Sequence, residues 1–72
     1  MERFSDENRR ALLHLCTRRD LSWETVSAMQ AAISACGRPS EHGKREAMAA
    51  KLIRIVQASP TEAEVRRRVK GL

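Results

Sequence analysis

The chain has 72 residues and a mass of 8.1 kDa, which is enough for one small domain. Leu, Ile, Val and Phe together make up only about a fifth of it, and ten alanines supply much of the remaining hydrophobic content. The length excludes a Rossmann unit, a closed barrel, a kinase and any large catalytic pocket. With a formal net charge of +5, the composition predicts a soluble domain with a thin core that gains stability from a partner or a second copy.

The chain shows no sustained alternation of apolar and polar residues, and helix-forming residue types dominate it. We therefore predict an all-α fold, a small single-domain bundle of three to four short helices over residues 1–72. The expected helices cover approximately residues 6–18, 22–36, 44–58 and 60–70.

The first predicted helix, 6–18, is expected to be capped by Ser5. At about 100° per residue, one of its faces combines Asn8 with an apolar group. That apolar group consists of Phe4, Ala11, Leu12, Leu15 and Cys16. Leu13 falls at the edge of this face.

The second predicted helix has Ser22 as its N-cap, and Leu21 and Val26 have the spacing of a hydrophobic staple. Its expected apolar centre consists of Val26, Met29, Ile33 and Cys36. The stretch from Thr25 to Cys36 carries no charge, and a helix without a charged face is normally covered on more than one side. We expect this helix to be either the central helix of the fold or the seam of a homodimer through Thr25 to Cys36.

The third predicted helix, 44–58, follows a loop that contains Pro39 and Gly43. Its broad apolar side consists of Met48, Ala49, Leu52, Ile53, Ile55 and Val56. For the fourth helix we predict Ser59 as the N-cap, Pro60 at the first helical position and Glu62 as the capping-box residue. Its apolar stripe is Val65, Val69 and Leu72.

The charge is divided unevenly between the two halves of the chain. Residues 1–36 are neutral overall, whereas residues 37–72 carry nine basic and four acidic side chains. A basic half can bind phosphates, and the residues expected to do so are Lys51, Arg54, Arg66, Arg67 and Lys70. A nucleic-acid-binding regulator is thus the alternative function. A helix-turn-helix is disfavoured, because residues 22–36 supply only Gln30 for reading bases.

Catalytic and metal-binding patterns are weak in this sequence. His14 and Cys16 are two residues apart, so on a helix they point in nearly opposite directions. Cys36 and His42 would supply only two ligands, fewer than a structural zinc site requires. We predict no enzyme activity, no catalytic residues, no cofactor and no metal. We also expect no signal peptide, a cytoplasmic location and reduced thiols at both cysteines.

The predicted function is therefore a small non-catalytic regulator that docks on a protein partner, as an inhibitor or adaptor of the kind common in phages and mobile elements. Leu13 and Trp23 lie at the margins of their apolar arcs and are expected beside the junction of the first two helices. Arg9 and Arg19 would supply a charged rim. Tryptophan and arginine are enriched in binding hot spots. The competing interpretation is that Trp23 closes the end of the core.

Overall fold

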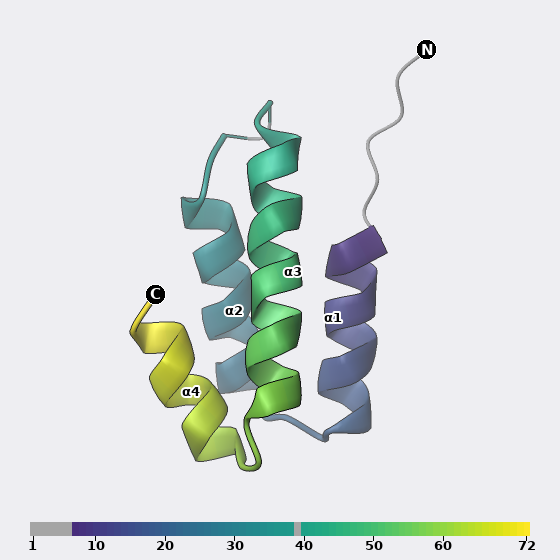
Figure 1. Ribbon diagram of the computed structural model, residues 1–72, viewed down its shortest axis with the longest axis vertical. Helices are drawn as coiled ribbons and strands as arrows, with labels where there is room; N and C mark the ends of the chain where they lie inside the picture. Colours follow the sequence, from purple (N-terminus) through teal and green to yellow (C-terminus); the bar gives the residue numbers. More distant parts are fainter. Residues whose placement is uncertain (1–6, 39) are drawn as a thin grey trace.

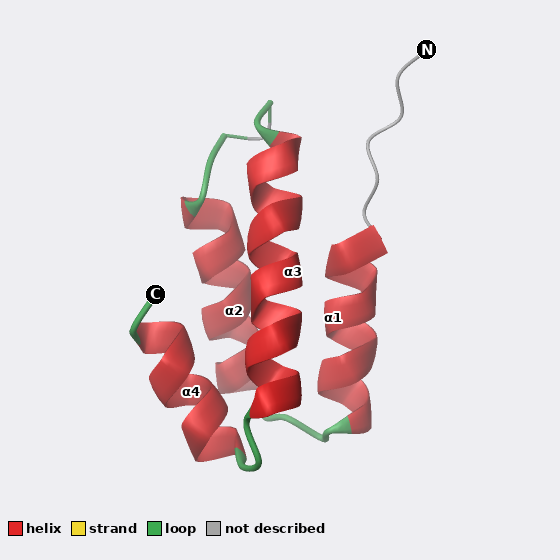
Figure 2. Cartoon of the chain, viewed as in Figure 1, coloured by secondary structure: helices red, strands yellow, loops and turns green. Residues whose placement is uncertain are grey.

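The computed structural model describes residues 7–38 and 40–72, which form four helices and no strand (Figures 1 and 2). This confirms the predicted all-α class. The helices are α1 (Glu7–Arg18), α2 (Trp23–Ala35), α3 (His42–Ala58) and α4 (Glu62–Lys70). Each begins and ends within two residues of its predicted position. The expected cap Ser5 and the core candidate Phe4 lie outside the described residues.

The central helix of the bundle is α3. It packs against α1, α2 and α4, and α2 also packs against α4. Figure 1 shows α1 and α2 on either side of α3. The expectation that the uncharged helix, α2, is central was wrong. The longer α3 fills this role because it buries Ala49, Leu52 and Val56 completely, and the alanine allows close approach.

The core is small and, among the described residues, entirely aliphatic or sulfur-containing. It consists of Leu12, Cys16, Met29, Ile33, Ala49, Leu52, Val56, Val65 and Val69. All nine lie on faces that the sequence predicts as apolar. Ala11 and Leu72 were also expected to face inward, but both are exposed. Leu72 lies beyond the end of α4, where its side chain no longer follows the Val65–Val69 stripe.

A tight Schellman turn joins α1 to α2. The Asp20 N–H donates to Thr17 O at 3.1 Å, and the Leu21 N–H donates to Cys16 O at 3.0 Å. Asp20 has a φ of 53°, the left-handed conformation that this turn requires and that Asp tolerates better than most residues. The turn reverses the chain without an intervening loop, so α1 and α2 start out close together at this end.

The turn between α3 and α4 corrects the predicted cap. Ser59 ends α3, and its buried hydroxyl donates to Ile55 O at 2.5 Å. It does not cap α4, which begins two residues later than predicted. Thr61 is the N-cap and accepts the Glu64 N–H at 3.3 Å. Thr61 and Glu64 repeat the capping spacing that the sequence also offers at Ser59 and Glu62.

Glu62 instead hydrogen-bonds to the start of α2, where Ser22 is the N-cap. Its carboxylate accepts the Ser22 N–H at 3.1 Å and the Thr25 hydroxyl at 2.6 Å, and the Ser22 hydroxyl also donates to it. These hydrogen bonds hold the pKa of Glu62 below its ordinary value, the Ser22 hydroxyl contributing most and the Thr25 hydroxyl next. The first residue of α4 therefore fixes the start of α2.

Candidate docking groove

A groove runs between α1 and α2, because both helices pack on α3 but not along each other. One hollow of about 400 Å³ is lined by Arg9, Arg10, Leu12, Leu13, Gln30, Ile33, Ser34 and Arg45. A second hollow of about 370 Å³, near the α1–α2 turn, is lined by Leu13, Cys16, Thr17, Asp20, Leu21, Trp23 and Val26. Leu13 lines both hollows, so they form one surface, which we call the α1–α2 groove.

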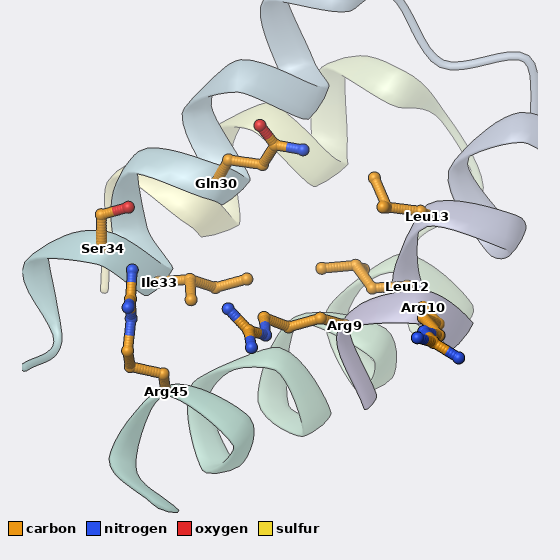
Figure 3. A pocket seen from close by; sticks show the side chains of 8 residues that line it. All are labelled: Arg9, Arg10, Leu12, Leu13, Gln30, Ile33, Ser34 and Arg45. Atoms are coloured by element: carbon orange, nitrogen blue, oxygen red, sulfur yellow. The ribbon is translucent and has the colours of Figure 1, made fainter. Parts of the chain in front are cut away.

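One end of the groove, which we call the arginine end, is strongly basic. Figure 3 shows Arg9 reaching from α1 toward Ile33, while Arg45 rises from α3 beside Ile33 and Ser34. Arg10 lies at the outer edge of the same hollow. Among the described residues no acidic side chain lines this hollow, which is surrounded by three positive charges and the polar groups of α2.

Both inward arginines have a buried Nε. Arg9 Nε lies 3.3 Å from Glu46 Oε2, and Glu46 also accepts the Asn8 N–H at 3.1 Å, which ties the start of α1 to α3. Arg45 Nε is buried and has no hydrogen-bond partner among the described residues. A buried donor without a partner is destabilising, so the described residues leave this Nε–H of Arg45 unsatisfied.

The other end, which we call the apolar end, is formed by Leu13 and Trp23 together with Leu21 and Val26. Leu13 is 44% exposed and Trp23 is 72% exposed. These are the two large exposed hydrophobic side chains that line the groove, and they face the same hollow from different helices. A side chain so exposed does not close a core, so the competing interpretation of Trp23 as a plug was wrong.

Of the four predicted docking residues, three line the groove and one does not. Arg9, Leu13 and Trp23 line it. Arg19 turns away to the end of α3, where its guanidinium donates to Val56 O at 2.6 Å and to Ser59 O at 2.8 Å. Arg19 thus satisfies carbonyls at the end of α3, and nothing in its amphipathic position indicated this long-range contact.

The sequence analysis did not identify Arg10, Gln30 and Arg45 as members of this surface. Arg10 could have been found by extending the Leu13 side of α1 by one turn. Arg45 comes from a third helix, and only the packing of α3 beneath α1 and α2 brings it into the same hollow.

The residues of the nucleic-acid alternative are all exposed on α3 and α4. Some of this charge is already matched within the chain. Arg66 pairs with Glu24 at 3.3 Å, and Arg67 pairs with Glu64. Arg68 also lies 3.6 Å from Glu64, so α4 presents less free positive charge than its sequence indicates.

Both cysteines are free thiols, Cys16 buried and Cys36 half-buried. Burial raises the pKa of the Cys16 thiol. Within residues 7–38 and 40–72, no three potential metal-ligating side chains gather, and no helix is long and apolar enough to cross a bilayer. Comparison of the chain with protein-family models, with curated proteins and with solved structures found no match.

Proposed function

We propose that this protein is a non-catalytic interaction module that docks on a protein partner through the α1–α2 groove. The observation that carries the proposal is the exposure of Leu13 and Trp23 on two helices around one hollow. Large apolar side chains gathered around a concavity with a charged rim are the usual anatomy of a binding hot spot. In the cytoplasm, where we place this activity, both free thiols would stay reduced.

The groove suits a helix better than an extended strand. The described residues offer no sheet edge for strand addition. α1 and α2 form two walls, and α1 is roughly 18 Å long, which matches a helical segment of about 12 residues. A helix laid between α1 and α2 would cover Leu13 and Trp23 together and would complete a bundle around the existing core.

Site-specific photo-crosslinking in cells that encode the protein tests the docking surface. A benzophenone side chain at position 17, on the wall of the groove, should crosslink one protein, whereas the same group at position 54 on α3 should not. The captured partner, once purified, should bind the wild type and lose most of its affinity for Trp23→Ala. Leu72→Ala is the control. Leu72 has about the same exposed fraction as Leu13 but does not line the groove. Equal binding by all three proteins would refute the proposal.

Titration with duplex DNA and single-stranded RNA at two salt concentrations tests the nucleic-acid alternative. If the protein acts by docking on a protein, we expect it to bind neither nucleic acid at moderate salt. Tight binding whose log affinity falls steeply with log salt, and which is weakened by Lys51→Gln and Arg54→Gln, would replace the docking function with nucleic-acid binding.

A further inference from the structure

We propose that the arginine end of the α1–α2 groove binds carboxylate side chains of the partner, so that the docked helix is acidic at that end and apolar at the other. This inference rests on the proposed function and specifies the chemistry of the partner.

The hollow at this end is positively charged. Arg9, Arg10 and Arg45 line it, and no acidic residue of 7–38 and 40–72 does. Glu46 neutralises one guanidinium at most, through its contact of 3.3 Å with Arg9. The arginine end therefore keeps an excess of positive charge in a partly enclosed space. There a carboxylate is attracted more strongly than on an open surface.

The state of Arg45 points to the same ligand. Its Nε is buried, no described residue accepts from it, and Figure 3 shows its side chain reaching from α3 to the hollow. Guanidinium groups bind carboxylates through two parallel N–H···O bonds. A carboxylate from outside would pair with the terminal nitrogens of this guanidinium, which reach the hollow.

Polar groups of α2 also line the hollow. Gln30 and Ser34 lie one turn apart on α2 and line the same hollow, so they offer an amide and a hydroxyl to a bound carboxylate. At the apolar end, by contrast, the side chains are Leu13, Leu21, Trp23 and Val26, with Asp20 as the charged group. The two ends of one groove thus have different chemistry, and this fixes the direction in which a partner helix lies.

A displayed library of randomised peptides of about 16 residues, long enough to fill the groove as a helix, provides the probe. Selection on the immobilised wild type should enrich peptides with apolar residues at helical spacing and with Asp or Glu in one terminal turn. For the best of these synthesised as a free peptide, Arg45→Gln should lower the affinity about fivefold or more, and Trp23→Ala should lower it further. Arg54→Gln removes the same charge from α3 outside the groove and should have little effect.

A charge exchange then separates direct pairing from a general effect of charge. Arg45→Glu should bind the selected peptide weakly and should regain affinity when the acidic residue of the peptide is replaced by Lys. Thermal unfolding gives an independent readout. Because Arg45 Nε has no partner in the free protein, Arg45→Gln should leave the Tm unchanged or raise it while it weakens binding.

The possible failures are distinguishable. If the selected peptides depend on Trp23 but show no acidic enrichment and no sensitivity to Arg45→Gln, the carboxylate inference is wrong and the docking function stands. If no selected peptide depends on Leu13 or Trp23, the docking function itself is wrong. If duplex DNA binds and Arg45→Gln weakens that binding, the hollow recognises phosphate rather than carboxylate.

Discussion

Thr25 on α2 and Glu62 on α4 are 37 residues apart, and the Thr25 hydroxyl donates to the Glu62 carboxylate at 2.6 Å. Thr25 is fully buried, so this hydrogen bond satisfies a polar group that water does not reach. The same carboxylate receives the N–H and hydroxyl of Ser22, the N-cap of α2. One acidic side chain therefore connects the start of α4 to the start of α2.

The stability of the protein should fall with acidification because of this contact. The pKa of Glu62 is lowered on folding, mainly by the Ser22 hydroxyl and then by the Thr25 hydroxyl. Its contribution is thus fully present above the ordinary carboxyl pKa and is lost as the pH falls through the lowered, folded-state pKa. Urea unfolding of wild type and Glu62→Gln at a series of pH values should show the two stabilities converging in acid.

Glu41→Gln is the control for that experiment. The pKa of Glu41 is also lowered, by its pairing with Lys44 and by the Arg38 N–H, so this variant removes an acid-sensitive contact elsewhere. In the Glu41→Gln background, Glu62→Gln should change the stability by the same amount as it does in the wild type. A stability profile in Glu62→Gln that still parallels the wild type throughout would contradict the role assigned to Glu62.

Arg19 should contribute to stability rather than to binding. Its guanidinium satisfies Val56 O and Ser59 O at the end of α3, so Arg19→Ala leaves both carbonyls without this donor. We expect a loss of about 1–3 kcal/mol in the free energy of unfolding, measured by chemical denaturation. Arg18→Ala, at an exposed neighbouring position, should change it by less than about 0.5 kcal/mol. Equal effects of the two substitutions would show that the contacts of Arg19 contribute nothing.

Trp23 should behave as a surface residue of the free protein. Because it is 72% exposed, Trp23→Ala should change the free energy of unfolding by less than about 0.5 kcal/mol. Since the chain has one tryptophan, its fluorescence reports this site alone. Acrylamide should quench it efficiently in the free protein and poorly once a selected peptide is bound. Protection from quenching without any ligand would mean that the side chain is covered.

Self-association through α2 stays a prediction, and the structure indicates where to test it. Ala28, Ala31 and Ala35 are exposed on the side of α2 that faces away from the core, and no charge interrupts them. The predicted homodimer would be observed by sedimentation equilibrium at high micromolar concentration. Ala31→Glu should dissociate it without loss of helical circular dichroism, whereas Ala63→Glu on α4 should not. A monomeric wild type under these conditions would rule the dimer out.

The sequence was sufficient for the features that depend on local pattern. Helical periodicity placed Leu12, Met29, Leu52 and Val65 in the core, and Ser22 was identified as a cap from its neighbours alone. It was insufficient where two residues offer the same cap. Ser59 and Thr61 each precede a glutamate by three positions, yet Thr61 is the N-cap of α4 and Ser59 ends α3.

The part of the candidate site that depends on helical periodicity was also predictable from the sequence. The marginal positions of Leu13 and Trp23 in their apolar arcs follow from the helical period, and both line the groove. The direction of Arg19 depends on a contact with Val56 of α3, 37 residues away in the chain. Arg45 reaches the groove only because α3 packs against both α1 and α2. Amphipathic patterns carry no information about such long-range placement.

The dependence of α1 on a single neighbour has a consequence for hydrogen exchange. α1 packs extensively only on α3, whereas α2, α3 and α4 each pack on two or more helices. The amides of α1 should therefore exchange through a partial opening in which the other three helices remain folded, at a lower free energy than global unfolding. The Schellman turn at Asp20 is the hinge for that opening. The wall of the groove that carries Leu13 would then open as one unit, and a bound helix would protect it.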